Sequence, residues 1–455
     1  MAKAKVEEIK ENIKDITITE FANTKYREYW ENVNQNKNAF FPEEQLVAVN
    51  RHLCWAAYKI GMKPGFTVKT PYLTGEIIKT HVSGDQGVND SIALAAQGYR
   101  RQVGSRLLRG EGNLGSFPGD PGAASRYTQV ECTPLLHRII KDMKYMNTYK
   151  DPEGTEMVEW VSAPIPMMLV NGVKQVGDGR SCYIAERNIN EIIDWLEDTS
   201  KPAPLPMSSL GCKTYYNPNG NGFIVYEAEI KKNLKISGKR GKWDEIVGLP
   251  PGLSVKNAIL LLKDKLPKNV GNKVEDNIGD GNFISIYVPA GHLDDKKVLS
   301  KLKLYGGRKE YVYVWDRDLN TMRETDLKEV ADVWLESRQE IVSRRINDII
   351  DSLKSKIHRT DLIQTYVDKG MSDWKVEDIE NELGKDNANI VLSTSARAFL
   401  PESLAKNEKD RKAWNKEIKE NQGYLKNIKK FVLDEARQIV KEQEEFFAYH
   451  DQVIE

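Results

Sequence analysis

The chain has 455 residues, about three times the length of a typical domain, so we expect two to four domains. Lys and Arg together number 67, as do Asp and Glu, which excludes a net charge that would attract nucleic acid to the whole chain. No apolar run reaches the roughly 18 residues that cross a bilayer, so we expect no membrane contact. Four cysteines without a CxxC pair favour a reducing compartment, the cytoplasm.

Helical patterns dominate the first third of the chain. After a polar N-terminal arm (1–30), apolar residues recur at helical spacing from Pro42 to Gly61, and the opposite face of this helix offers Arg51 and His52. A second helical stretch begins near Asn89 or Asp90. The stretch that follows, 104–125, is rich in glycine and is predicted to be irregular. Short helices around such a loop suggest a helix-turn-helix or winged-helix module over 31–150.

The rest of the chain divides into two blocks. Residues 151–325 contain strand-like alternation at 221–230 and 282–288 and a helical stretch at 255–266, which predicts an α+β domain. Residues 326–455 show helical spacing almost throughout, and two long helices flank a globule at about 372–408. An antiparallel coiled coil and an ordinary helical bundle both fit this spacing.

The motifs that would indicate a nucleotide site or a metal site lack the surrounding sequence that such sites require. Gly110, Gly112 and Gly115 match G-x-G-x-x-G, but prolines follow where a dinucleotide site would begin its helix. Asp316 and Asp318 are interpreted as part of a hairpin turn, and the histidines form no HxxxH or HExxH pair. We therefore expect no metal site on this chain.

Basic side chains gather beside the glycine-rich stretch: Arg100, Arg101, Arg106 and Arg109. Such clusters are usually solvated surfaces, yet three of them, the other two at 231–242 and 296–309, favour contact with a phosphate backbone in a chain of zero net charge.

The residues between Thr80 and Val130 resemble a known family. They include THVSGDQGVNDSIALAAQ and LLRGEGNLGSFPGDPGAASRYTQV, which look like the breakage–reunion core of type IIA DNA topoisomerases, the A subunit of gyrase and topoisomerase IV. APIPMMLVNG (163–172), EIVGLPPGLSVKNAILLLK (245–263) and VADVWLESRQEIVSRRINDI (330–349) resemble later elements of the same family. The resemblance spans about residues 20 to 455, and its most specific part ends in Arg126-Tyr127-Thr128.

The resemblance implies a fold and a function. The fold would be multidomain α+β: a winged-helix DNA-gate domain (31–150), an α/β tower domain (151–325), and a long antiparallel coiled coil with a small helical dimerisation globule (326–455). The function would be that of the DNA-cleaving and rejoining subunit of an ATP-dependent type II DNA topoisomerase.

Partners follow from the same resemblance. The chain ends after the second long helix, which is similar to the medium subunit of T4-like bacteriophage topoisomerases. We therefore expect a homodimer that binds double-stranded DNA and assembles with a large subunit into a heterotetramer. ATP, and most of the contacts to Mg²⁺, would lie on that subunit. The expected reaction is relaxation or decatenation, in the host bacterial cytoplasm if the protein is phage-encoded.

Roles for individual residues also come from the resemblance. Tyr127 matches the nucleophile that forms a transient 5′-phosphotyrosyl link, Arg126 the arginine beside it, and Lys37 a basic position near the scissile phosphate. A tyrosine, with an ordinary pKa near 10, needs such positive charge to react at neutral pH. Arg51 matches a DNA-contacting position, and Val176 stands where the family inserts an apolar wedge between base pairs.

Two departures from the family pattern concern the stretch after Thr80. Ser83 replaces a family histidine, with His81 two residues earlier, and we count both residues, with His52, among the DNA-binding candidates. In the region linked to quinolone response, Gln86 replaces a serine while Asp90 keeps the acid. The alternative function is a non-catalytic architectural protein that bridges DNA through its winged helix and coiled coil.

Overall fold

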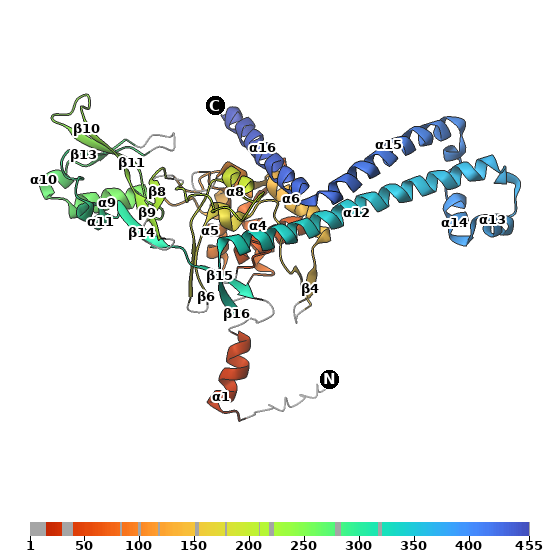
Figure 1. Cartoon of the computed structure of the whole chain (residues 1–455), viewed down its shortest axis with the longest axis horizontal. Coiled ribbons are helices and arrows are strands. Elements are labelled where there is room, and N and C mark those ends of the chain that lie inside the picture. The colour runs from red at the N-terminus through yellow and green to blue at the C-terminus, as the bar shows by residue number, and fades with distance from the viewer. Residues whose placement is uncertain are drawn as a thin grey trace, which may run out of the picture.

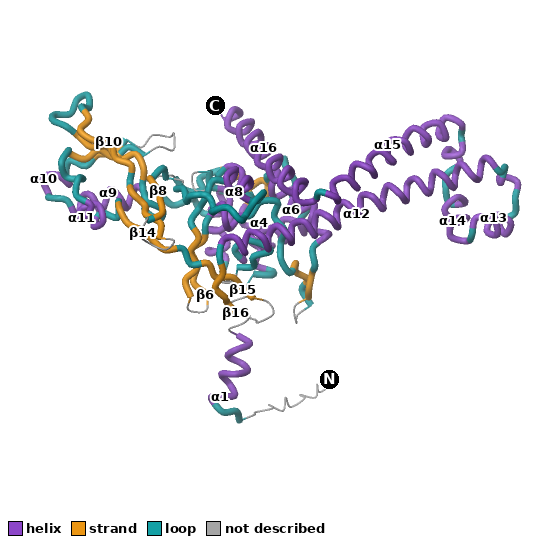
Figure 2. Tube along the Cα trace, in the orientation of Figure 1, coloured by secondary structure: helices purple, strands orange, loops and turns teal. Residues whose placement is uncertain are grey.

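Mixed helices and strands form three connected parts (Figures 1 and 2). The computed structural model describes residues 15–29, 40–81, 84–98, 102–116, 119–150, 154–177, 180–208, 210–217, 223–277, 284–316 and 321–454. A central body carries a strand-rich lobe on one side and a long helical arm on the other (Figure 1). Helix α1 (Ile18–Phe21) stands apart from the body, and every side chain described between 15 and 29 is exposed.

Helices and a small antiparallel sheet build the first half of the body. Its elements are α3 (Ala48–Lys59), α4 (Thr70–Ile78), α5 (Asp85–Ala96), α6 (Pro134–Asp142), β1 (Thr67–Lys69), β2 (Leu108–Glu111) and β3 (Gln129–Cys132), with strand order β1-β3-β2. Leu53, Leu108 and Val130 are fully buried between helices and sheet. Strand β2 lies inside the glycine-rich stretch that was predicted to be irregular, so that prediction is wrong for these four residues. Cross-strand pairing with β3 overrides the local composition.

The same hydrophobic core continues past residue 150. Further elements of the body are β4 (Thr148–Lys150), β5 (Glu156–Val158), α7 (Met167–Asn171), β6 (Val173–Gly177), β7 (Arg180–Ile184) and α8 (Ile189–Trp195). Leu169, Ile184 and Ile192 are buried in one cluster with Leu53 and Val130. The predicted domain boundary at residue 151 therefore does not coincide with an end of this core.

The lobe has a core of its own. Its strands are β8 (Lys213–Tyr216), β9 (Phe223–Glu227), β10 (Glu229–Leu234), β11 (Trp243–Gly248), β12 (Glu275–Asp276), β13 (Ile286–Pro289) and β14 (Tyr305–Lys309), and its helices are α9 (Val255–Lys265), α10 (Lys268–Gly271) and α11 (Lys296–Lys301). They form antiparallel sheets of order β10-β11-β13-β12 and β14-β9-β8. Ile246, Leu262 and Ile286 are buried between sheet and helices. A hairpin of β15 (Val312–Asp316) and β16 (Thr321–Thr325) then leads to the arm.

Two long helices form the arm. Helix α12 (Leu327–Asp368) begins at Asp326, whose side chain caps it by accepting the N–H of Glu329 at 2.8 Å. Helices α13 (Val376–Leu383) and α14 (Lys385–Leu392) form the tip, and α15 (Pro401–Lys426) returns alongside α12.

The returning helix is not continuous, contrary to the spacing of its apolar residues. Asn427, with φ −134° and ψ 52°, separates α15 from α16 (Ile428–Ile454). Beyond this break, Val432, Ala436 and Ile439 are buried in the core of the body, where α16 packs on α6 and α8. The change of direction is set by tertiary packing, which the periodicity does not encode. In the part of the chain that the structure describes, no helix is long and apolar enough to span a membrane.

Candidate active site

Tyr127 lies exposed at the end of a short turn on the surface of the body. The turn is a single 3₁₀ helix, Ser125–Tyr127, in which the N–H of Tyr127 donates to the carbonyl of Ala124 at 2.9 Å. The tyrosine side chain is 69% exposed. A large aromatic residue at the surface, directly before a buried strand, is available to a macromolecular ligand.

The residue after Tyr127 fixes the turn to the body. Thr128 is buried, its hydroxyl lies 2.8 Å from that of Thr70, and its carbonyl accepts the N–H of Thr70 at 3.1 Å. This places the turn against the N-terminus of α4, while β3 continues into the sheet. The phenol therefore projects from a rigid support rather than from a long loop.

Glycine is required where the preceding loop passes behind the turn. Gly112 has φ +89°, and a Cβ there would lie 2.8 Å from the carbonyl oxygen of Tyr127. Gly122 would bring a Cβ to 3.0 Å from the backbone of Leu114. The glycines thus allow the loop to pack directly against the residue that carries the phenol.

Arg126 brings positive charge to the same place. Its side chain is exposed, and its guanidinium carbon lies 4.9 Å from the centre of the Tyr127 ring. An exposed guanidinium beside an exposed phenol can meet one phosphate group, whose oxygens match the planar donors of arginine.

Four predicted site residues cannot be placed. Lys37, Ser83, Arg100 and Arg101 lie outside the described residues. Their roles stay predictions.

The prediction that Arg51 and His52 occupy an exposed helix face is wrong. Arg51 is 4% exposed, and its Nε donates to Glu44 at 2.8 Å inside the body. Its guanidinium also lies 4.5 Å from the ring centre of Phe41. An arginine buried in this way stays paired with its internal carboxylate, because a buried carboxylate without a partner would destabilise the fold. We withdraw Arg51 and His52 as direct DNA contacts.

His52 and His81 form a buried pair. Their ring centres are 4.6 Å apart, and the Nδ1 of His52 lies 2.8 Å from the Thr80 hydroxyl. Burial, with His81 and Arg51 as smaller causes, lowers the pKa of His52 to about 2. His52 is therefore neutral at physiological pH, and His81, also buried, does not face solvent as a DNA ligand would.

Arg106 and Arg109 are both half-buried and engaged. Arg106 stacks on Phe447 of α16, with its guanidinium carbon 3.8 Å from the ring centre. Arg109 pairs with Glu131 at 2.7 Å and with Glu111 at 2.5 Å. Their positive charge is held within the protein, so the predicted basic cluster is weaker than its sequence indicates.

Val176 lies near the end of the hairpin β6–β7, opposite Ser181 in the register. It is 61% exposed, although it is a β-branched apolar residue in a strand. Exposure at this position is compatible with the expected wedge, which must reach a ligand outside the protein.

Gln86 and Asp90 lie on one face of α5, one turn apart. The amide nitrogen of Gln86 donates to the Asp90 carboxylate at 2.9 Å. Gln86 is exposed. The acid of this pair is therefore already engaged by the residue that replaces the family serine.

One contact of the loop was missed by sequence reasoning. Asp120, whose N–H bonds to the Ser116 hydroxyl at 3.1 Å, lies 3.6 Å from Lys256 at the start of α9. The loop that leads to Tyr127 is thereby linked to the lobe. No local signal indicates a pairing across this sequence distance.

Tyr127, Arg126 and Val176 are thus the described site residues whose side chains are exposed most clearly. A family model for the A subunit of DNA gyrase/topoisomerase IV matches residues 46–437. Since this range covers most of the chain, the protein belongs to that family.

Individual relatives agree with the family match. The chain is 25% identical to the DNA gyrase A subunit of Buchnera aphidicola, over 86% of this chain and 52% of the relative. It is 24% identical to the DNA gyrase A subunit of Borreliella burgdorferi, over 78% of this chain and 46% of the relative. It is 28% identical to the DNA topoisomerase 4 A subunit of Mycoplasma pneumoniae, over 48% of this chain and 28% of the relative. The chain thus spans about half the length of the first two relatives.

Proposed function

We propose that this protein is the DNA-cleaving and rejoining subunit of an ATP-dependent type II DNA topoisomerase, with Tyr127 as nucleophile. The observation that carries the proposal is the exposed Tyr127 beside Arg126, held by a buried threonine at the end of a glycine-rich loop. Membership of the family formed by the A subunits of gyrase and topoisomerase IV supports it.

The reaction conserves one phosphodiester bond at each step. The phenolic oxygen of Tyr127 attacks phosphorus and loses its proton, a bond from phosphorus to tyrosine forms, and the bond to the 3′ oxygen breaks. The 3′ oxygen leaves with a proton as a hydroxyl group. Because the new ester stores the bond energy, the 3′ hydroxyl can attack in turn and restore the DNA.

Arg126 would stabilise the extra negative charge that the phosphorus centre carries midway through the step. Its guanidinium is already beside the phenol, so little reorganisation is required. Lys37 is proposed as a second cation near the scissile phosphate. The described part of the chain holds no group of three or more His, Cys, Asp and Glu side chains that could bind a metal. ATP is proposed to bind to the partner subunit, which is also proposed to hold Mg²⁺ for the most part.

The three parts of the structure support corresponding roles. We propose that the helices and three-stranded sheet around Tyr127 are the winged-helix DNA gate, that the lobe is the tower, and that the arm is a coiled coil whose tip joins two copies. Two tyrosines in a homodimer would cut both strands, and a large ATPase subunit would drive a second duplex through the break. We propose relaxation or decatenation as the result, in a bacterial cytoplasm, that of the host if the protein is phage-encoded.

Labelled DNA tests the proposal directly. The protein, its candidate large subunit, Mg²⁺ and ATP are mixed with duplexes labelled at either the 3′ or the 5′ end, and the reaction is stopped with detergent and heated to separate the DNA strands. A 5′-phosphotyrosyl link moves the 3′-end label, and not the 5′-end label, onto this chain. Tyr127→Phe should abolish the band, while substitution of the exposed Tyr72 should keep it. A band that survives in Tyr127→Phe would refute the assignment.

The same experiment addresses the architectural alternative. A protein that only bridges DNA would bind the duplex tightly, form no covalent band with any partner, and keep its function in Tyr127→Phe.

A further inference from the structure

A small apolar cluster that joins Ala185 to Ile224, and a set of polar contacts, attach the hairpin that carries Val176 to the lobe. We call this set the hairpin joint, and it consists of Tyr183, Arg187, Tyr226, Arg308 and Glu310. Tyr183 is on β7, Tyr226 on β9 and Arg308 on β14, so the joint connects the body to the lobe.

The backbone makes the first connection. Tyr183 and Tyr311 form an isolated antiparallel bridge, with N–H to carbonyl distances of 2.8 and 3.0 Å in the two directions. Tyr311 lies between β14 and β15. The inner end of the hairpin is therefore fixed to the segment that leaves the lobe.

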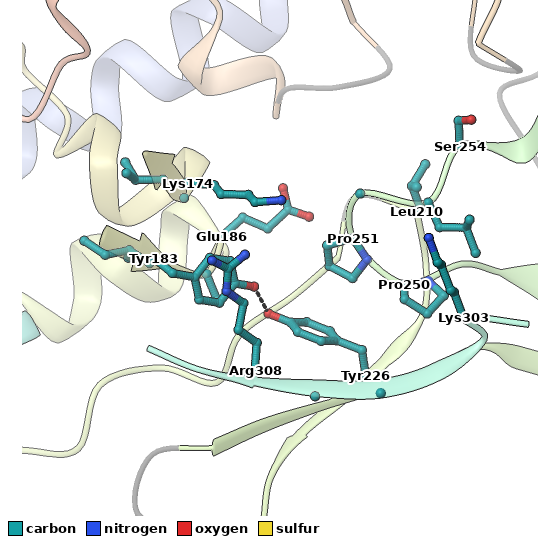
Figure 3. Close-up of a pocket in the computed structure, with 18 of the residues that line it drawn as sticks. Lys174, Tyr183, Glu186, Leu210, Tyr226, Pro250, Pro251, Ser254, Lys303 and Arg308 are labelled. Atoms are coloured by element: carbon teal, nitrogen blue, oxygen red, sulfur yellow. Dashed lines mark hydrogen bonds between the residues drawn. The ribbon is translucent and has the colours of Figure 1, made fainter. Parts of the chain in front are cut away.

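Two buried tyrosines make the second connection. The hydroxyls of Tyr183 and Tyr226 are hydrogen-bonded to each other, and both side chains are less than a tenth exposed (Figure 3). Burial raises the pKa of both hydroxyls, so each keeps its proton and the contact is between neutral groups. Loss of one hydroxyl would leave the other buried without this partner, which is costly.

Arg308 reaches from the lobe to β7, the strand that pairs with the strand of Val176. Its guanidinium carbon lies 4.2 Å from the ring centre of Tyr183, and its Nη2 lies 3.4 Å from the Ser181 hydroxyl. Ser181 is the residue directly opposite Val176, and directly opposed residues in an antiparallel pair place their side chains on the same face. Arg308 thus contacts the face of the hairpin that carries the wedge.

A buried ion pair makes the last connection. Arg187, fully buried, binds both oxygens of Glu310, at 3.0 Å from Nη1 and 2.7 Å from Nη2. The Oε1 of Glu310 also accepts the N–H of Ala185 at 2.8 Å. Glu310 therefore secures the chain immediately after β7 to the strand end at β14.

A cavity of about 710 Å³ lies beside these contacts. Lys174 and Tyr183 line it from the hairpin, and Pro250, Tyr226 and Lys303 line it from the lobe (Figure 3). The cavity leaves one side of the junction unfilled, so the named contacts and the small cluster around Ala185 and Ile224 hold the hairpin against the lobe.

From these observations, and resting on the proposed function, we propose that Arg308 and Tyr226 are positioning residues for the wedge. Separating stacked bases costs free energy, and an apolar side chain can do so only if its support does not yield. A two-stranded ribbon alone is a weak support. The hairpin joint braces the hairpin against the lobe. Bending of the DNA by the wedge is therefore coupled to the position of the lobe.

Paired variants on one strand test the proposal. Arg308→Ala removes the brace, and Lys309→Ala removes the same charge from the neighbouring position, whose side chain points to the other face of β14. Energy transfer between dyes at the ends of a short duplex reports bending at saturating protein, with the full chain and its partner subunit. We expect Arg308→Ala to lower the ratio of bent to straight complexes about three- to tenfold, the effect of one hydrogen bond, and Lys309→Ala to leave it unchanged.

A second duplex separates positioning from general damage. A mismatch at the step where the wedge enters weakens stacking, so the defect of Arg308→Ala should largely disappear on this DNA. Tyr226→Phe, which removes a single buried hydroxyl, should behave in the same way if Arg308→Ala fails to fold. A defect that is equal on both duplexes, or no defect in either variant, would overturn the proposal.

Val176→Ala separates the brace from the wedge on which it rests, while the labelled-DNA experiment with Tyr127→Phe tests the proposed function independently. If Val176→Ala bends DNA as well as the wild type does, Val176 is not the wedge, and both ideas about the hairpin fall. If Val176→Ala fails to bend DNA while Arg308→Ala and Tyr226→Phe bend it normally, the wedge stands and only the brace is refuted.

Discussion

Arginine has opposite roles in two regions of this molecule. Where α6, α12 and α16 meet, Arg338 is 1% exposed and its Nη2 lies 2.7 Å from Asp142 and 2.8 Å from Glu435. At the tyrosine turn, Arg126 is exposed and stacks beside Tyr127. The buried arginine holds three helices together, and the exposed one is available to a phosphate. Burial and pairing, rather than residue type, separate the two roles.

The largest expected effect comes from breaking the buried junction. Asp142, fully buried, accepts from Arg345 at 2.7 Å and pairs with Arg338. Asp142→Ala leaves both guanidiniums dependent on Glu435, so we expect the free energy of unfolding to fall by about 3–5 kcal/mol. Urea unfolding followed by tryptophan fluorescence measures the change.

Asp348→Ala is the matched control for this variant. Asp348 also pairs with a cation, Lys144 at 2.8 Å, but both side chains are more than half exposed. We expect a much smaller change. Equal loss in the two variants would mean that burial does not decide the strength of these pairs.

The second effect concerns the exposed arginine. Arg126→Ala should slow DNA cleavage about 10²–10³-fold, or about 2.7–4 kcal/mol, because a donor aimed at the developing charge is lost. The melting temperature should stay that of the wild type, since the side chain is exposed. Single-turnover cleavage and a thermal melt are measured on the same preparation, and Arg126→Lys should recover part of the rate. A lower melting temperature with normal cleavage would show that Arg126 stabilises the fold, as Arg338 does, and does not assist the reaction.

The sequence predicts where the two regions lie, but it does not predict which arginines are buried and which are exposed. The pattern around Arg126-Tyr127-Thr128 marks the turn that we propose is reactive, and the helical spacing after Leu327 marks the arm. Nothing local distinguishes Arg51, which the structure buries against Glu44, from an arginine on the surface. An arginine acquires its role from partners supplied by distant segments, and single-sequence patterns do not contain those distances.

Packing between segments also decides the features of the fold that the sequence did not reveal. Strand β2 forms in a glycine-rich stretch because β3 offers it a partner, and the long helix breaks at Asn427 because α16 packs on the body. The hairpin joint is of the same kind, since Tyr183 and Tyr226 are brought together only by the fold.

A third prediction uses pH to extend the comparison to a buried imidazole. The folded-state pKa of His52, about 2, lies below its ordinary value of 6.5. Above pH 6.5, His52 is neutral in both the folded and the unfolded protein and does not change the free energy of unfolding with pH. As the pH falls from 6.5 towards 2, the free energy of unfolding decreases, because the unfolded chain binds a proton at His52 that the folded protein excludes. The loss from this group should approach about 1.4 kcal/mol per pH unit.

His52→Gln checks the pH prediction. The glutamine amide cannot take up the proton, so the free energy of unfolding of His52→Gln should fall less steeply than that of the wild type between pH 6.5 and 5. Urea unfolding at several pH values measures the two slopes. His358→Gln, on an exposed position of α12, should follow the wild type. Parallel slopes for all three proteins would show that His52 takes up its proton without unfolding.

The smallest effect is expected where an ion pair is as short as those of the junction but half exposed. Arg411 on α15 lies 2.6 Å from Asp361 on α12, and the side chains are 44% and 46% exposed. A double-mutant cycle with Arg411→Ala and Asp361→Ala should give a coupling below about 1 kcal/mol, because water competes for both charges. The coupling should shrink further in about 1 M salt. Since the distance matches that between Arg345 and Asp142, a coupling of junction size would show that bond length, and not burial, sets the worth of an arginine pair in this protein.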